Sequence, residues 1–266
     1  MGIEDQAVGN RPCLNRFSLA GQVIAITGGS RGIGRAIALD AAVSGASVAI
    51  CGRDQASLDD VVTIIEGLGG ECIGFNCDIT TLGAAEAFLN HCVDSFRGID
   101  GFVNNAGFNR LKAAVDYTPQ EVDEIFDINL RTVYWSCVAA YKTMARVARG
   151  GAIVNVTSAA SVVGAPERAP YSAAKAGVNN LTRTLAAEWA PNVRVNAVAP
   201  TVTMTPLGEK AMQNSPRLAR DVEEKILLGR PARDVEVSAP VIFLLSHAAS
   251  MITGHVLVVD GGWTIV

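Results

Sequence analysis

Tyr171 and Lys175 are the residues whose types and spacing point most directly to chemistry. They stand four residues apart in Y-S-A-A-K, within a segment of helical spacing, and residues at i and i+4 share one face of a helix. The pKa of a free tyrosine is near 10, and a neighbouring cation lowers it by favouring the phenolate. The pair can therefore act as a general acid–base, although the same spacing is also typical of an amphipathic helix with a surface lysine.

Ser158 is a second candidate because it directly follows the apolar run Ala152–Thr157. Such a run predicts a buried strand, and open α/β sheets bind ligands outside the carboxyl ends of their strands. The Ser158 hydroxyl can hold a substrate oxygen beside Tyr171; the alternative is a turn residue that satisfies its own backbone. The chain has no G-x-S-x-G motif and no histidine in a nucleophile pattern, which disfavours a hydrolase.

A glycine-rich turn, T-G-G-S-R-G-I-G at Thr27–Gly34, joins the first predicted strand to the first predicted helix. Its glycines let the backbone approach a pyrophosphate, and the helix N-terminus adds unpaired N–H groups and the positive end of the dipole. The spacing G-x-x-x-G-x-G differs from the G-x-G-x-x-G fingerprint. The turn predicts a dinucleotide site; the alternative is merely a tight strand–helix turn.

Arginines beside this turn indicate which dinucleotide it would bind. Arg53 follows the second predicted strand, at the distance where an acid would hold the ribose of NAD and an arginine would suit the 2′-phosphate of NADP. Arg31 can reach the same phosphate, and paired guanidinium groups bind a dianion well. Asp54 could serve as the NAD-type acid, but its place suits a helix N-cap better. NADP(H) is favoured, with NAD(H) left open.

The elements that position these residues alternate regularly between strand and helix. We predict one doubly wound α/β domain of the Rossmann type, with a mainly parallel sheet of about seven strands and helices on both faces. Residues 1–17 are expected to form a flexible extension, 18–266 the catalytic domain and the irregular stretch 201–230 a substrate lid. The predicted strands are Gln22–Thr27, Ala46–Cys51, Glu71–Asn76, Gly101–Val103, Ala152–Thr157, Val193–Val198 and His255–Val259. The predicted helices are Ile33–Ala42, Gln55–Leu68, Ala84–Phe96, Gln120–Ala148, Ala169–Ala190 and one within Pro231–Ser246.

Composition narrows the class of protein. Apolar residues make up 49% and charged residues 18% of the 266-residue chain, which excludes a disordered or fibrous protein. The net charge of −4 disfavours nucleic-acid binding, and no apolar run approaches the ~20 residues of a membrane span. The six cysteines and three histidines lack metal-binding spacing, so no metal is expected. The N-terminal residues lack a hydrophobic signal core, which predicts a cytoplasmic protein.

From about Leu19 to Trp263 the chain resembles the classical short-chain dehydrogenases/reductases. The resemblance rests on motifs that occur in family order. They are T-G-G-S-R-G-I-G (Thr27–Gly34), C-D-I-T (Cys77–Thr80), N-N-A-G (Asn104–Gly107), Asn129, Ser158, Y-S-A-A-K (Tyr171–Lys175), R-V-N-A-V-A-P (Arg194–Pro200) and V-D-G-G-W (Val259–Trp263).

The resemblance implies a role for each matching residue. Tyr171 would be the general acid–base, Lys175 would lower its pKa and bind the nicotinamide ribose, Ser158 would hold the substrate oxygen, and Asn129 would anchor a water in a proton relay. Asp78 and Ile79 would contact the adenine ring, although Asp78 also resembles a helix cap. The cofactor-binding set that the resemblance implies, with Arg53 added from the argument above, is Gly28, Ser30, Arg31, Gly32, Ile33, Gly34, Arg53, Asp78, Ile79, Asn104, Ala106, Gly107, Tyr171, Lys175, Pro200, Val202 and Thr203.

The implied reaction is reversible hydride transfer between NADP(H) and a carbonyl or secondary alcohol: a ketone, a 3-oxoacyl compound, or a sugar or polyol. The alternatives are an NAD-dependent dehydrogenase of a polyol or sugar acid, a non-redox nucleotide-binding protein, and a dehydratase or epimerase on the same fold. The apolar segment Ile252–Val266 would pack in a homotetramer, or a homodimer. One departure stands out: the family usually has Pro-Gly where this chain has Pro200-Thr201.

Overall fold

The computed structural model describes residues 15–147 and 150–266, and its centre is a sheet of seven parallel strands. The strands lie in the order β3-β2-β1-β4-β5-β6-β9, so the chain reverses its direction of travel across the sheet between β1 and β4. This topology confirms the predicted doubly wound architecture. The bounds are β1 Val23–Thr27, β2 Ser47–Gly52, β3 Cys72–Asn76, β4 Gly101–Asn104, β5 Gly151–Val156, β6 Val193–Pro200 and β9 Val256–Val259.

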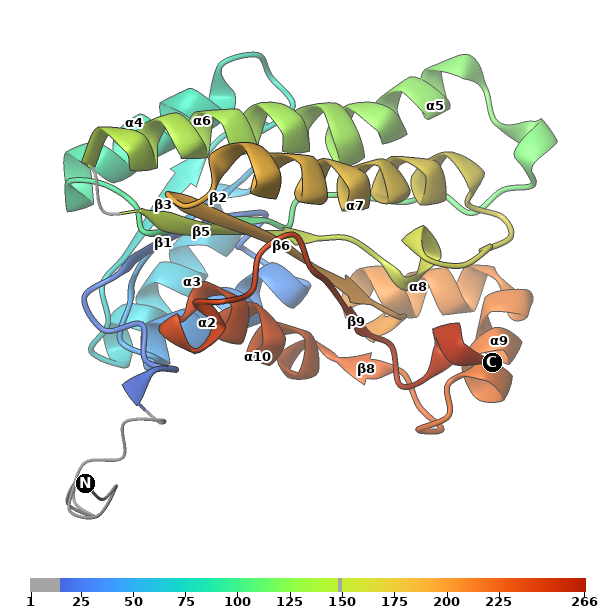
Figure 1. Ribbon diagram of the computed structural model, residues 1–266. Coiled ribbons are helices and arrows are strands. Elements are labelled where there is room, and N and C mark those ends of the chain that lie inside the picture. Colours follow the sequence, from blue (N-terminus) through green and yellow to red (C-terminus); the bar gives the residue numbers. More distant parts are fainter. Residues whose placement is uncertain (1–14, 148–149) are drawn as a thin grey trace, which may run out of the picture.

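Helices cover both faces of the sheet (Figure 1). One face carries α2 Gly32–Val43, α3 Gln55–Gly67 and α10 Asp234–Leu245; the other carries α4 Ala84–Phe96, α6 Thr132–Val147 and α7 Ala169–Trp189. Strands buried on both faces are apolar nearly throughout, as in V-I-A-I-T of β1. None of the helices in the described part of the chain has both the length and the apolar character of a membrane span.

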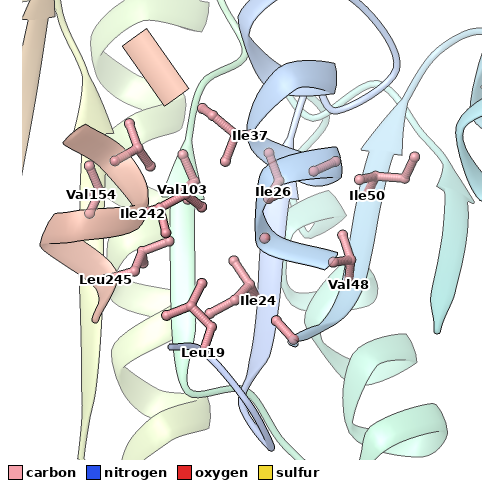
Figure 2. Packing of buried hydrophobic residues seen from close by; sticks show 14 of the residues in the cluster. Leu19, Ile24, Ile26, Ile37, Val48, Ile50, Val103, Val154, Ile242 and Leu245 are labelled. Atoms are coloured by element: carbon pink, nitrogen blue, oxygen red, sulfur yellow. The ribbon is translucent and has the colours of Figure 1, made fainter. Parts of the chain in front are cut away.

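Side chains of β1 alternate between two hydrophobic cores, one on each face of the sheet. Ile24 and Ile26 pack toward α2 and α10, where they meet Ile37 and Leu245 (Figure 2). Ala25 faces the opposite way and joins the core under α4, α6 and α7. All of these side chains are at most 3% exposed. The two cores fix the carboxyl ends of the strands, which is where the candidate site lies.

The long helix predicted over Gln120–Ala148 is divided in the structure. It begins as α5 Pro119–Phe126, passes through the π-helical turn η2 Asp127–Arg131 and continues as α6; Ala148 lies outside the described residues. π-Turns inside helices interrupt the regular spacing and are frequent at functional sites. This turn contains Asn129, whose side chain is fully buried. Periodicity alone did not reveal the interruption.

The stretch 201–230 was expected to be irregular, and that expectation is wrong. It contains β7 Thr203–Met204, which pairs with β8 Ala232–Arg233, and two helices, α8 Pro206–Asn214 and α9 Pro216–Lys225. Thr205 and Ser215 cap these helices by accepting from backbone N–H groups. Each proline occupies the first turn of its helix, where the missing N–H costs nothing. Pro206 and Pro216 therefore mark the starts of these helices.

Candidate functional site

The glycine turn lies at the carboxyl end of β1, beside the point where the strand order reverses. Gly28 has a φ of +65°, and a Cβ at Gly34 would lie 2.1 Å from the Gly28 carbonyl oxygen. The turn therefore closes on itself so tightly that only glycine fits at position 34. Ser30 leads into α2, which begins with Gly32 and Ile33 and whose N-cap residue, Arg31, makes no side-chain cap. The first N–H groups of α2 are thus available to an anion.

Asn105 holds this turn against the end of β4. Its Nδ2 atom donates to the carbonyl oxygens of Thr27 and Gly28, each at 3.0 Å. The Thr27 hydroxyl in turn accepts from the backbone N–H groups of Asn105 and Ala106. The sequence argument assigned roles to Asn104, Ala106 and Gly107 but not to Asn105. The signal was present, because Asn105 is the second asparagine of N-N-A-G.

We expect Gly34→Ala to abolish tight dinucleotide binding. The new Cβ would also lie 2.5 Å from Asn105 Nδ2, so the turn and its clamp must both shift. Titration of the variant with NADPH, followed by cofactor fluorescence, should give a dissociation constant at least ~10-fold higher. Gly67→Ala is the matched control, because a Cβ at this position, at the end of α3, would meet no atom within 4 Å. Equal affinity in the Gly34 variant and the wild type would contradict this account.

The end of β2 presents cations rather than an acid. Asp54 is confirmed as the N-cap of α3, since its Oδ1 atom accepts from the Ser57 backbone N–H at 2.7 Å. This hydrogen bonding lowers the pKa of Asp54, and the charge of Arg31 lowers it slightly further. Arg53 is mostly exposed and approaches Asp78 at 3.9 Å, a surface ion pair of little strength. Gly52, just before Arg53, lies against Ser30, because a Cβ at this position would be 3.2 Å from the Ser30 Oγ atom.

The other residues that were predicted to contact the adenosine lie after β3 or at the end of β4, and their side chains have different surroundings. Asp78 accepts from the backbone and the hydroxyl of Thr80, while Gly83 is the N-cap of α4, so Asp78 does not cap that helix. Ile79 is buried in the core under α4. The Asn104 side chain also points inward, where Nδ2 donates to Asn155 Oδ1 at 2.9 Å. Only the backbone of Asn104 can therefore border a cofactor.

Lys175 is anchored next to Tyr171 on the same face of α7. Its Nζ atom donates to the Val156 carbonyl at the end of β5 (2.9 Å) and lies 5.8 Å from the centre of the Tyr171 ring. The lysine side chain is buried, and this burial lowers its pKa to about 8. An ammonium group so close to the ring, and so easily deprotonated, suits a role in proton transfer.

Ser158 lies beside Tyr171 at the end of β5. The Ser158 Oγ accepts from the Ala160 backbone N–H at 3.2 Å, so its own hydrogen remains free to donate. Burial raises the pKa of Tyr171, while hydrogen bonding with Ser158 and the charge of Arg168 oppose this rise. A pKa-lowering effect of Lys175 on Tyr171 stays a prediction.

Asn129 and Lys175 meet at Gly107. A Cβ on Gly107 would lie 2.7 Å from Asn129 Oδ1 and 3.5 Å from Lys175 Nζ. The Asn129 Nδ2 atom donates to the carbonyls of Phe108 and Ile125, whereas Oδ1 is buried without a hydrogen-bond partner in the described part of the chain. An acceptor of this kind fits a water-mediated link to Lys175.

A pocket opens beside Ser158, with a volume of about 280 Å³ including its open mouth. Arg168, Thr201, Val202 and Trp263 line it together with small residues of segment 159–165. Trp263 was not foreseen as a site residue. It is positioned by Asp260, which accepts from the N–H groups of Gly262 and Thr264. Val202 and Trp263 also contact the apolar side of α9, and Pro200 and Thr203 are buried beside them.

These residues fit a nicotinamide dinucleotide. The turn at Thr27–Gly34 and the uncapped start of α2 can hold a pyrophosphate, and the groups at Ser158, Tyr171 and Lys175 lie along the same edge of the sheet. Such a cofactor supplies the hydride that the protein's own side chains cannot.

Comparison with known proteins gives the same result. Residues 28–264 match the family model described as enoyl-(acyl carrier protein) reductase. The chain is 39% identical to D-threitol dehydrogenase of Mycolicibacterium smegmatis, over 94% of this chain and 95% of that protein. It is 32% identical to 2-dehydro-3-deoxy-D-gluconate 5-dehydrogenase of Escherichia coli, over 94% and 98%.

Among solved structures, a putative NAD(P)-dependent gluconate 5-dehydrogenase from Beutenbergia cavernae with bound NADP has a TM-score of 0.88 and 34% identity, covering 94% of this chain and all of that one. Motifs, topology and relatives agree on a nicotinamide-dependent oxidoreductase. The chain belongs to the short-chain dehydrogenases/reductases, as an enzyme of the alcohol dehydrogenase and carbonyl reductase type.

Proposed function

We propose that this enzyme interconverts a secondary alcohol and its carbonyl compound with NADP(H), and that its substrates are polyols or sugar acids. The observation that carries the proposal is the meeting of Ser158, Tyr171 and Lys175 at the end of β5, beside a small pocket lined mainly by apolar residues. A weak acid, a hydrogen-bond donor and a cation together match what carbonyl reduction requires.

Each of these side chains has one task in the proposed mechanism. The Ser158 hydroxyl donates to the substrate oxygen and orients it. In reduction the Tyr171 hydroxyl gives its proton to that oxygen, and in oxidation the phenolate takes the alcohol proton back. Lys175, held by the Val156 carbonyl, places positive charge beside the phenol. Asn129 Oδ1, the unpartnered acceptor across Gly107, completes a route for the proton away from Tyr171.

The preference for NADP(H) rests on the charges around the end of β2. Arg31 and Arg53 are both exposed there. Asp54, the acid that directly follows Arg53, is already engaged as the cap of α3. A doubly charged phosphate is therefore a better ligand for this surface than an uncharged hydroxyl pair.

Arg53→Ala should change the cofactor preference and little else. We expect KM for NADP⁺ to rise about 10- to 100-fold, because a charge-assisted contact with the phosphate is lost. KM for NAD⁺ should change less than about 3-fold, since its ribose carries no phosphate at this position. Initial rates with each cofactor, measured on the same alcohol, give both values. A wild-type enzyme that prefers NAD⁺, or a variant equally weakened for both cofactors, would overturn the NADP assignment.

The substrate class is supported by the relatives named above, which act on threitol and on sugar-acid derivatives according to their names. A panel of polyols, sugar acids, simple ketones and 3-oxoacyl thioesters, assayed with NADP⁺ or NADPH, tests it. Oxidation of a polyol or sugar acid with matching NADPH formation is the expected result. Conversion without net change in the cofactor would favour an epimerase or dehydratase, and cofactor binding without any conversion would favour a non-redox nucleotide-binding protein.

Assembly as a homotetramer, or a homodimer, stays part of this proposal. Several large apolar side chains are exposed in the single chain, among them Tyr134 and Trp135 on α6 and Ile265 and Val266 at the end of the chain. An interface between copies would cover such side chains.

A further inference from the structure

Arg168 lies at the mouth of the reaction site and is not part of the proposed proton transfer. It is the N-cap residue of α7, three residues before Tyr171, and it lines the same pocket as Ser158. Its charge opposes part of the rise that burial causes in the pKa of Tyr171. Because Arg168 lines this pocket, it is placed to contact a substrate that occupies the pocket.

The guanidinium group of Arg168 has no partner within the described residues. It forms none of the ion pairs found there, and its Nε atom is buried without a hydrogen bond. The two acids near it are engaged elsewhere: Asp221 pairs with Lys225 at 2.9 Å, and Glu167 accepts from the Ser215 hydroxyl at 2.8 Å. A buried donor left unpaired is destabilising, so a ligand that satisfies it gains binding energy.

Another residue that lines this pocket carries a second polar group with no hydrogen-bond partner among the described residues. The Thr201 hydroxyl is buried and makes no hydrogen bond in the described part of the chain. Thr201 lines the pocket with Arg168 and follows β6 directly. It also stands where the family usually has glycine, so this hydroxyl is a feature of this chain. Two residues with unsatisfied donors in the described part of the chain, one of them a cation, therefore line the same pocket.

We propose that Arg168 and Thr201 bind a carboxylate, so that the substrate is a small hydroxy acid and the product the corresponding oxo acid. Arginine stays protonated and binds carboxylates with two parallel hydrogen bonds. This inference rests on the proposed function and narrows its substrate class from polyols and sugar acids to the acids. No bond to the carboxylate forms or breaks: the hydroxyl-bearing carbon gives a hydride to NADP⁺, the hydroxyl gives its proton to Tyr171, and the carboxylate only anchors the molecule.

Pairs of substrates that differ only in the carboxylate test the proposal. Suitable pairs are threonate with threitol, xylonate with xylitol, and gluconate with glucitol, in which a hydroxymethyl group replaces the acid. The wild type should have a higher kcat/KM for the acid of at least one pair. Arg168→Gln should lower kcat/KM about 10- to 100-fold more for that acid than for the matching alcohol, mainly through KM. Arg168→Lys should recover part of the loss, and Thr201→Val should give a smaller loss with the same selectivity.

Arg183→Gln is the matched control, because Arg183 is exposed on the same helix and lies outside the pocket. It should leave both substrates of each pair unaffected. The thermal midpoint of Arg168→Gln should equal or exceed that of the wild type, since the guanidinium group makes no hydrogen bond or ion pair in the described part of the chain that could be lost; a structural arginine would lower it.

Binding measured without turnover gives an independent readout. Trp263 lines the pocket, so its fluorescence should change on titration with the acid of the preferred pair, and Trp263→Phe should abolish this signal. The change should weaken in Arg168→Gln. Equal losses for acid and alcohol in that variant, or a wild type that prefers the alcohols, would overturn the carboxylate site while leaving the proposed oxidoreductase intact. If the wild type oxidises neither member of any pair and does not bind the acids, this inference is overturned. The panel of polyols, sugar acids, simple ketones and 3-oxoacyl thioesters then decides whether the proposed function holds.

Discussion

Replacing Tyr171 with phenylalanine should lower kcat about 10³-fold in both directions, because proton transfer by a positioned group contributes roughly 10²- to 10⁴-fold. The substitution removes one hydroxyl and keeps the ring against Lys175. Dissociation constants for NADPH should therefore stay within about 3-fold of the wild type. Tyr134→Phe is the control, since it deletes the same atom from an exposed tyrosine on α6. Near-normal turnover in Tyr171→Phe would show that another group moves the proton.

The same tyrosine sets the expected pH dependence. Burial raises its pKa, so the phenol is protonated at neutral pH in the cofactor-free protein. Oxidation needs the phenolate, and kcat/KM for the alcohol should rise as the pH rises above neutral. Reduction needs the phenol, and kcat/KM for the carbonyl should fall at alkaline pH. Both limbs should be absent from the residual activity of Tyr171→Phe.

The sequence was sufficient for the features that depend on local pattern. The apolar strands, the order of the motifs and the cap at Asp54 all follow from spacing that a single segment carries. The doubly wound topology followed because strands and helices alternate without a break. Each of these predictions needed only residues that are close together in the chain.

The sequence was insufficient where the outcome depends on segments that are distant in the chain. Asn129 reaches Phe108 only because of a π-turn that periodicity does not reveal. Trp263 enters the pocket because β9 pairs with β6 and Asp260 folds the following turn. The missing partners of Arg168 and Thr201 can be recognised only in the structure, because the structure shows that the acids near Arg168 bind other groups. Pro206 and Pro216 could have been interpreted correctly, since a capping hydroxyl precedes each of them.

Lys175→Met should separate activity from stability. We expect kcat to fall at least about 10²-fold, because the cation beside the phenol is lost. Folding stability at neutral pH should not fall with the activity, because the buried lysine itself destabilises the folded state. Burial lowers the pKa of Lys175 from an ordinary value of 10.5 to about 8, so keeping its proton in the folded state at neutral pH costs on the order of 3 kcal/mol. The methionine variant avoids this cost. Its Val156 carbonyl, however, loses a hydrogen-bond donor, which offsets about 1–3 kcal/mol of the gain in the free energy of unfolding.

The sign of the pH dependence follows from proton binding. Between about pH 8 and pH 10.5 the unfolded chain holds a proton on Lys175 that the folded protein has released, so wild-type stability gains from this group as the pH rises. The methionine variant lacks this gain. Its free energy of unfolding, measured by urea denaturation, should equal or exceed that of the wild type at pH 7 and lose about 3 kcal/mol relative to it by pH 10.5. Lys142→Met, at an exposed position on α6, should show no such trend. If the difference in the free energy of unfolding between this variant and the wild type does not vary with pH, Lys175 keeps its proton in the folded state. Its positive charge would then be held at the site without the energetic cost that burial implies.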